Sequence, residues 1–359
     1  MMSQLLRGWW LYIVLGLLVV MVYAWSRAVM RVVPVEALLA HDGPSVASKQ
    51  PAQQPLQWFP EELKLEELPQ LMAQQPLLGV ALSVVTAGAL GLALGGFGLT
   101  LWGLWTGRAR AVWRFPAHSL PSWSFGELGR IVFLMIVIAM LLIPVVVAVS
   151  LVGHHPVALD AHLRITVSML VLDAAAILVV AAFAVGKGSS AWKTFGLSRR
   201  SLAPAISTGL RGYVTMFPWL FVVLFLVVNA AHALGLEPPI EPIQELIFQE
   251  GRPLVLGLTA VLACLVGPVA EELFFRGIVF SALRQRSSRT VAMLGSAAAF
   301  ALMHGNPVGF PSILLLGCLL AYLYERTGSL ASSLAVHILH NTFLMSTALI
   351  VRRLLELVS

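Results

Sequence analysis

The sequence contains few charged residues. Only 11% of its 359 residues are Asp, Glu, Lys or Arg, whereas soluble domains carry about 25%. Hydrophobic residues make up 58%, and the mean hydropathy is +0.87. This balance excludes an ordinary soluble globular domain and indicates a protein that crosses a membrane several times.

Cysteines and the common catalytic motifs are scarce as well. Cys264 and Cys318 both fall in apolar segments, which argues against a structural disulfide or a cysteine metal site. The chain has no HExxH or GxSxG motif, the signatures of the commonest zinc proteases and serine hydrolases. It also lacks a glycine-rich phosphate loop and a cluster of stacking aromatic residues beside its basic ones. We therefore expect neither phosphoryl transfer nor nucleic-acid binding.

Apolar segments predict the helices. A membrane helix needs about 20 apolar residues, and the sequence offers nine candidates, of which the seventh and eighth are short. They cover about residues 8–30, 76–106, 129–152, 165–186, 212–234, 253–283, 290–305, 310–325 and 329–351. The uncharged part of the first, Gly8 to Trp25, is longer than a signal-peptide core, so we interpret it as an anchor. The predicted fold class is all-α, a polytopic transmembrane helical bundle of about eight to nine membrane helices.

Basic residues are distributed unequally between the loops. With the N-terminus inside, 15 of the 23 Lys and Arg residues fall on the inner side and eight on the outer side. Because membrane proteins keep Lys and Arg inside, we expect a cytoplasmic N-terminus in a bacterial inner membrane. We divide the chain into 1–120, a two-helix membrane region with an extracytoplasmic loop at 32–75; 121–249, accessory transmembrane helices; and 250–352, a core that carries the polar residues described next.

Two adjacent carboxylates, Glu271 and Glu272, lie inside the sixth apolar segment. A carboxylate at membrane depth costs about 2.5–3.5 kcal/mol, so an intramembrane pair indicates a functional site. Arg276 follows Glu272 by four residues, which places both on one helix face and allows an ion pair. Glu271 then points about 100° away and is free to act. Just upstream, Gly267 and Pro268 predict a kink or break in the helix.

Three further polar residues lie at membrane depth. His304 is near the end of the seventh segment, and His337 and Asn341 share a helix face in the ninth. A glutamate can take a proton from water, and an amide or imidazole N–H can stabilise an oxyanion. Glu271, His304 and His337 would also suit zinc, which lowers the pKa of bound water. The inventory therefore predicts hydrolysis of a carbonyl compound such as a peptide bond, either with a metal or without one.

These residues carry a resemblance to a known family. Glu271-Glu272-x-x-x-Arg276, Phe300-x-x-x-His304 and His337-x-x-x-Asn341 resemble, in order and approximate spacing, the CAAX protease and bacteriocin-processing (CPBP, or Abi) family of intramembrane proteases, which includes the type II CAAX prenyl endopeptidases. The resemblance covers about residues 250–350. It implies that Glu271 activates water with help from His304, that His337 and Asn341 polarise the scissile carbonyl, and that Glu272 and Arg276 support them. Members are described as metalloproteases, and a metal-free glutamate mechanism is also argued for them.

The resemblance leads to specific expectations about the site and its partners. The motifs lie at different depths on straight helices, so a shared intramembrane catalytic cavity requires breaks, which we place at Gly267–Pro268 and Gly305–Pro307. The implied partners are membrane lipid and a peptide or protein substrate, prenylated substrates included, with no nucleic acid. The alternatives are a non-catalytic scaffold or immunity factor and an ion-coupled transporter. For Asp173, in the fourth segment, we expect a pairing with Arg164 or Asn229 ahead of a place in the same cavity.

Overall fold

A computed structural model of the full chain describes residues 12–17, 21, 72–108, 114–116, 120–152, 161–187, 190–236 and 242–358. Of the predicted first helix only residues 12–17 and 21 are described, and of the loop 32–75 only residues 72–75, so the rest of both predictions lies outside the described residues. The helices that follow are α5 (Pro76–Trp105), α6 (Phe125–Val152), α7 (Ala161–Val185), α8 (Ala191–Thr194), α9 (Arg199–Ala233), α10 (Pro242–Gln249), α11 (Pro253–Val261), η2 (Leu262–Val266), α12 (Gly267–Glu271), η3 (Glu272–Phe280), α13 (Ser281–Arg284), α14 (Arg289–Met303), α15 (Phe310–Thr327) and α16 (Leu330–Val358).

Six stretches of the described chain are long and apolar enough to cross a membrane. They are Pro76–Trp105, Phe125–Leu142, Ala161–Val185, Arg199–Ala233, Pro253–Arg284 and Leu330–Leu357. The described residues form helices and no strands. These observations confirm the prediction of an all-α, polytopic integral membrane protein. The number of crossings stays open, because α14 is apolar but has only 15 residues.

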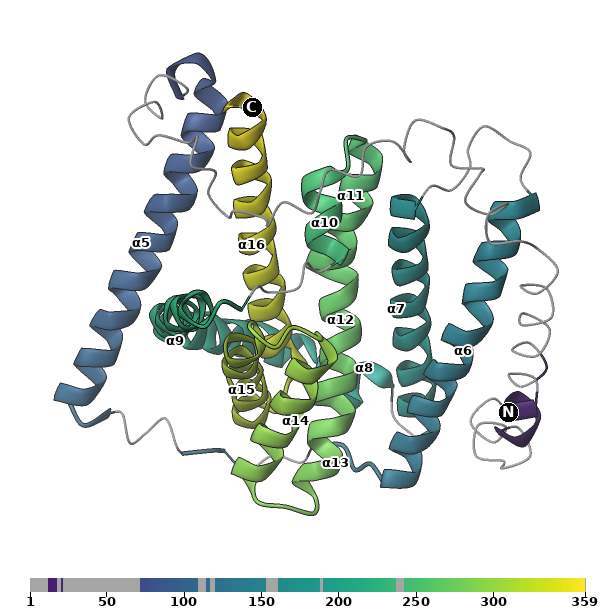
Figure 1. The fold of residues 1–359 in the computed structure, drawn as a ribbon. Helices are drawn as coiled ribbons and strands as arrows, with labels where there is room; N and C mark the ends of the chain where they lie inside the picture. Colours follow the sequence, from purple (N-terminus) through teal and green to yellow (C-terminus); the bar gives the residue numbers. More distant parts are fainter. Residues whose placement is uncertain are drawn as a thin grey trace.

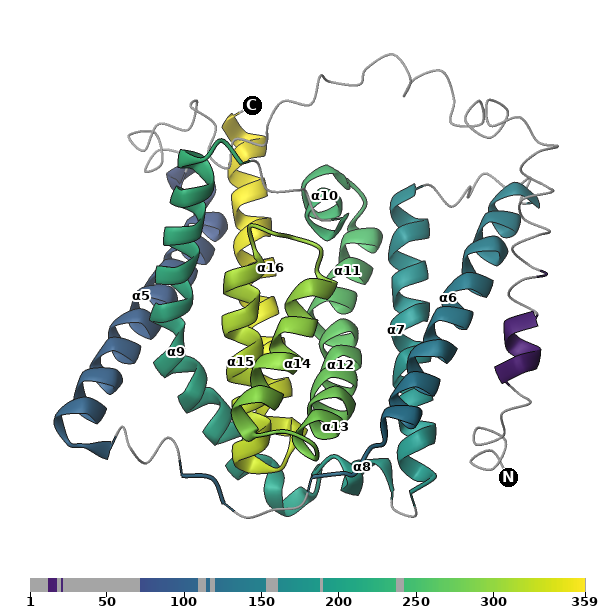
Figure 2. The same cartoon turned by 60° about the horizontal axis from the view of Figure 1, so that its bottom comes forward.

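The bundle is built around the last third of the chain. Figure 1 shows the rod α11–α13 next to α14, α15 and α16, with α6 and α7 on one side and α5 on the other. Figure 2, turned by 60°, keeps α6 beside α7 and shows α5 next to α9. Two apolar cores fill the interior, one around Ile278, Phe280 and Tyr324, the other around Phe217 and Leu320. The predicted site residues lie on the rod, α14 and α16, so they sit inside this arrangement.

The rod Pro253–Arg284 switches from α-helix to π-helix twice. It runs as α-helix, then π-helix in η2, α-helix in α12 and π-helix again over nine residues in η3. Proline inside a helix removes a donor and clashes with the preceding turn, and π-turns are frequent where a helix accommodates a functional site. Pro268 follows η2 by two residues, so the predicted disturbance at Gly267–Pro268 is present as a change of winding.

Helix α9 corrects the sequence prediction. The fifth segment was expected at 212–234, but α9 starts 13 residues earlier, at Arg199, and includes Pro204. Tertiary packing explains the extension. A Cβ on Gly209 would collide with the backbone of Ser332, and one on Gly212 would lie 2.9 Å from a methyl group of Leu323. The two glycines let α9 lie directly on α15 and α16, and this contact outweighs the weak local helix preference.

The short helix α10 was not predicted from the sequence. A cluster of polar residues beside it, here called the polar clasp, consists of Glu250, Arg252, His162 and Arg352. Glu250 follows α10 and is 3% exposed. Its carboxylate accepts hydrogen bonds from Arg252, and His162 Nδ1 lies 3.1 Å away. Arg252 holds the pKa of Glu250 down at about 2. Arg352 donates to the carbonyl of the same residue, so this clasp joins the ends of α7, α10 and α16.

Candidate active site

The site begins with a buried ion pair on η3. Arg276 Nη1 lies 2.9 Å from Glu272 Oε1, and the two side chains are 0% and 1% exposed. This is the pair that the i,i+4 spacing predicted. Arg276 Nη2 also donates to the carbonyl of Gly317 at 3.3 Å, and its guanidinium stacks 4.4 Å from the centre of the Phe300 ring. A fully buried arginine is thus compensated by a carboxylate, a carbonyl and an aromatic face.

Gly317 makes this arrangement possible. An added Cβ there would lie 3.0 Å from the Cβ of Ala297 and 3.3 Å from the Phe300 ring. Helices α14 and α15 can therefore approach closely at this level, which brings the Gly317 carbonyl within reach of Arg276.

His337 connects the two glutamates. Its Nδ1 lies 3.0 Å from Glu272 Oε1, and its Nε2 lies 3.4 Å from Glu271 Oε2. Because the Glu272 carboxylate is paired with Arg276, it accepts a hydrogen bond from Nδ1–H of His337 and fixes the orientation of the ring. The ring then presents Nε2 to Glu271. Arg276, Glu272, His337 and Glu271 form a series of polar contacts. The His337 side chain is 2% exposed and the Glu271 side chain is 34% exposed, so Glu271 is the residue of the series that is accessible from outside.

Phe300 lies at the centre of the three motifs. Its ring centroid is 5.6 Å from that of His337, 4.7 Å from that of His304 and 5.3 Å from that of Phe275, all edge-to-face. One aromatic side chain of α14 thereby brings together residues that straight helices would place at different depths. Phe300 is part of a sequence motif, but no role was predicted for it.

His304 lies just beyond α14, beside a break. Its Nδ1 lies 2.9 Å from the carbonyl oxygen of Phe300. A carbonyl oxygen can only accept a hydrogen bond, so Nδ1 carries a proton. Gly305 has φ +65, and Gly309 N donates to Asn306 Oδ1 before α15 begins at Phe310. The break predicted at Gly305–Pro307 is therefore present. No hydrogen bond or ion pair joins His304 to Glu271 in the described part of the chain, so the two meet only through Phe300 and His337.

Asn341 has a structural bond that the sequence did not predict. Its Nδ2 donates to the carbonyl of Ala263 at 2.8 Å. In η2 the Gly267 N–H bonds to the carbonyl five residues back, Leu262, so the next donor in this register would be residue 268. That residue is Pro268, which has no N–H. Asn341 supplies the donor that Pro268 lacks, and one amide hydrogen remains for other use.

Removing this amide is expected to destabilise the fold. Asn341→Ala leaves the Ala263 carbonyl without a donor, which costs about 1–3 kcal/mol. Pro268→Ala restores an N–H at the required position, so the double variant should recover most of the loss. Thermal unfolding of the purified chain in detergent measures both. An Asn341→Ala loss that Pro268→Ala leaves unchanged would contradict the pairing.

The candidate metal ligands are not assembled in this arrangement. Among the described residues no group of three or more His, Cys, Asp or Glu side chains lies close enough to hold a metal ion. His337 uses Nδ1 on Glu272, and His304 turns Nδ1 to the Phe300 carbonyl. Glu271, His304 and His337 would need to move together before they could bind zinc, so no step below depends on a metal.

Asp173 lies beside the site rather than in the expected ion pair. No hydrogen bond or ion pair to any other described residue holds its side chain, and Asn229 instead donates to the Phe225 carbonyl. A Cβ on Gly267 would lie 3.6 Å from Asp173 Oδ2, and Asp173 interacts electrostatically with Glu271. The expected pairing was wrong, and the alternative place near Glu271 fits the structure.

Comparisons with known proteins relate part of this chain to membrane peptidases. Residues 253–343 match the family described as type II CAAX prenyl endopeptidase Rce1-like. A Bacillus subtilis (strain 168) protein named "Putative membrane peptidase YdiL" is 32% identical over 88 residues, which are 24% of this chain and 36% of that protein. The chain thus matches little more than a third of this relative's length. No solved structure matches the chain. The segment 253–343, which holds every motif residue of the site, is thus similar to the CAAX protease family that the motifs predicted.

Proposed function

We propose that this chain is an intramembrane endopeptidase that hydrolyses a peptide bond in a membrane-associated or lipidated protein or peptide. The observation that carries the proposal is the position of Glu271. Its carboxylate is one-third exposed and lies 3.4 Å from His337, whose ring is fixed from behind by the buried pair Glu272–Arg276. Two adjacent intramembrane glutamates thus have separate tasks, one held in place and one presented outward.

In the proposed reaction, Glu271 acts as general base. It takes a proton from a water molecule while the water oxygen bonds to the scissile carbonyl carbon, with His304 helping to hold the water. The carbonyl oxygen becomes an oxyanion, stabilised by the remaining amide hydrogen of Asn341 and by His337 through Nε2, which has to carry a proton in this step because Nδ1–H is already donated to Glu272. The C–N bond then breaks, and Glu271 returns its proton to the departing amine. Glu272 and Arg276 are positioning residues, because they act on His337 and do not reach the substrate.

A divalent metal, zinc foremost, stays a proposal beside this one. If His304 rotated toward Glu271, the set Glu271, His304 and His337 would offer one carboxylate and two imidazoles, and a bound zinc would supply an activated water. The chain's own residues would still orient the substrate and move the proton. Metal content measured on the assayed samples, with and without a chelator, separates the two versions.

The surroundings of the site suit a substrate that comes from the bilayer. The motif residues lie on the rod Pro253–Arg284, on the apolar helix α14 and on α16, whose apolar span is Leu330–Leu357. A prenylated or otherwise lipidated peptide, or a membrane-spanning protein, could reach Glu271 from lipid. We place the N-terminus in the cytoplasm of a bacterial cell, from the excess of Lys and Arg in the loops of that side.

A cleavage assay in liposomes tests the proposal. The substrates are a prenylated CAAX peptide, the same peptide without its lipid, and a single-span membrane protein. His337→Ala and His304→Ala should each reduce cleavage, His337→Ala by about 100-fold or more, because it removes both the partner of Glu271 and the oxyanion donor. His232→Ala, at an exposed position near the end of α9, is the matched control and should cleave like wild type.

Two outcomes would contradict the proposal. Equal cleavage by the wild type and both site variants would show that these histidines take no part. No cleavage of any substrate by well-folded wild type would favour the alternatives, a non-catalytic scaffold or immunity factor or an ion-coupled transporter. Proton or ion flux across the same liposomes tells those two apart.

A further inference from the structure

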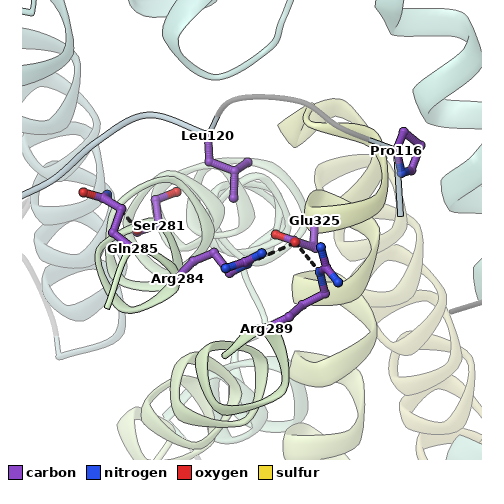
Figure 3. A pocket seen from close by; sticks show the side chains of 7 residues that line it. All are labelled: Pro116, Leu120, Ser281, Arg284, Gln285, Arg289 and Glu325. Carbon is purple, nitrogen blue, oxygen red and sulfur yellow. Dashed lines mark hydrogen bonds and ion pairs between the residues drawn. The ribbon is translucent and has the colours of Figure 1, made fainter. Parts of the chain in front are cut away.

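A polar pocket lies at one end of the bundle, away from the glutamates. It has a volume of about 360 Å³ and is lined by Pro116, Leu120, Ser281, Arg284, Gln285, Arg289 and Glu325. Figure 3 shows the side chains of Arg284 and Arg289 meeting the carboxylate of Glu325, with Leu120 at the edge of the same space. The volume falls in the range of about 300–1,000 Å³ that is usual for ligand sites.

The charges in this pocket do not cancel. Arg284 and Arg289 each donate through Nε to the same oxygen, Glu325 Oε1. Two guanidinium groups therefore face one carboxylate, which leaves a net charge of +1. A phosphodiester carries one negative charge, whereas a phosphate monoester carries about −1.5 to −2. The surplus charge matches a phosphodiester.

The hydrogen-bond donors for such a group are free and already oriented. Both arginines use only Nε on Glu325, and their terminal nitrogens form no hydrogen bond to another side chain or carbonyl within the described ranges. Arg289 is also held by the ring of Phe115, whose centroid is 4.3 Å from its guanidinium carbon. Arginines fixed in this way lose little conformational freedom when they bind an oxyanion.

The depth of the pocket indicates where its ligand comes from. Arg284 is the last residue of the apolar span Pro253–Arg284, so the pocket lies where the hydrocarbon region gives way to lipid headgroups. Pro116 and Leu120 add an apolar wall beside the arginines. A lipid headgroup has this same combination of a charged phosphate and an adjoining apolar chain. Basic pockets between transmembrane helices are known to bind anionic headgroups.

We propose that the pocket formed by Arg284, Arg289 and Glu325 binds the phosphodiester of an anionic membrane lipid. The lipid would tie the end of α13 to the start of α14 and to α15, the three helices that supply these residues. This site is separate from the proposed proteolysis and requires no turnover by Glu271.

Native mass spectrometry of the full chain released from nanodiscs tests the inference. With equal phosphatidylglycerol and phosphatidylcholine in the discs, wild type should retain phosphatidylglycerol preferentially. Arg284→Gln and Arg289→Gln should each lower that retention by about tenfold, as expected for loss of a charge-assisted bond. Arg286→Gln is the matched control, because it removes the same charge from the loop between Arg284 and Arg289. The Arg286 guanidinium binds the carbonyls of Trp123 and Ala282 and stacks on Phe125, outside the pocket lining.

A second variant covers the case in which losing an arginine damages the fold. Leu120→Trp keeps every charge but fills the pocket, and it should also abolish the preference. Equal retention by wild type, Leu120→Trp and the arginine variants, or an equal loss in Arg286→Gln, would overturn the proposal. The melting temperature is also measured in detergent after adding either inorganic phosphate or phosphatidylglycerol. If both raise it equally, the pocket binds soluble phosphate, and the proposal of a lipid ligand is overturned.

Discussion

Glu271→Gln is expected to lower the cleavage rate by about 100- to 10,000-fold, the contribution typical of a positioned general base. Glutamine keeps the size of the side chain and can still bond to His337, but it cannot accept a proton from water at neutral pH. Because Glu271 is partly exposed and lies outside the buried ion pair, its loss should leave the melting temperature nearly unchanged. Initial cleavage rates in liposomes and melting curves in detergent together measure this combination.

Glu356→Gln is the control for this substitution. Glu356 lies on α16 with a side chain 39% exposed and pairs with Arg352 and Arg353. Replacing it removes a carboxylate that is far along α16 from His337, and cleavage should stay at the wild-type rate. If Glu271→Gln cleaved as fast as Glu356→Gln, Glu271 would not be the base. An equal loss in both would indicate a general effect of charge.

Arg276→Met is expected to destabilise the fold by about 3–5 kcal/mol, the cost of leaving a buried carboxylate without its partner. Both members of this pair are almost completely buried, so water cannot replace the lost cation. Glu272→Gln in the Arg276→Met background removes the unpaired charge and should recover most of the stability. Activity should not return with it, because the His337 ring would no longer face an ionised carboxylate at Nδ1.

Arg353→Met provides the comparison. The Arg353 side chain is 53% exposed, and the cost of losing its ion pair should stay below about 1 kcal/mol. Unfolding midpoints in detergent and cleavage rates are measured on the same preparations. If the double variant were no more stable than Arg276→Met alone, the destabilisation would come from lost packing on Phe300. If the double variant also regained full activity, Glu272 would not position His337.

The sequence predicted those parts of the site that depend on spacing alone. The interval of four residues placed Glu272 and Arg276 on one face, and they form the expected ion pair. Long apolar runs predicted α5, α7, α14 and α15 to within a few residues at most ends. Of the two expected breaks, the one at Gly305–Pro307 is present as a turn, whereas at Gly267–Pro268 the helix continues and only its winding changes. The catalytic roles and the division into three regions stay predictions.

Contacts between helices were beyond the reach of the sequence. Phe300 joins the three motifs because α14, α16 and η3 converge on it, and no one-dimensional pattern contains that fact. Asn341 was assigned wholly to an oxyanion, yet it supplies a donor that Pro268, 73 positions earlier, cannot. Helix α9 was predicted too short because its first half is held by close packing through Gly209 and Gly212 rather than by hydrophobicity. Each of these depends on residues distant in the chain.

The π-helical turns of the rod make the site sensitive to insertions and deletions. Deleting one residue within η3 would shorten the rod by about 1.5 Å, a mismatch that a bilayer accommodates at a fraction of a kcal/mol per Å. The same deletion would rotate every following side chain by about 100°. A residue lost between Glu272 and Arg276 would leave the two three positions apart, which still permits an ion pair, but it would turn the later core residues Ile278 and Phe280 away from their contacts although the helix still spans the membrane. In this stretch the number of residues sets the direction of the side chains far more strictly than it sets the length of the helix.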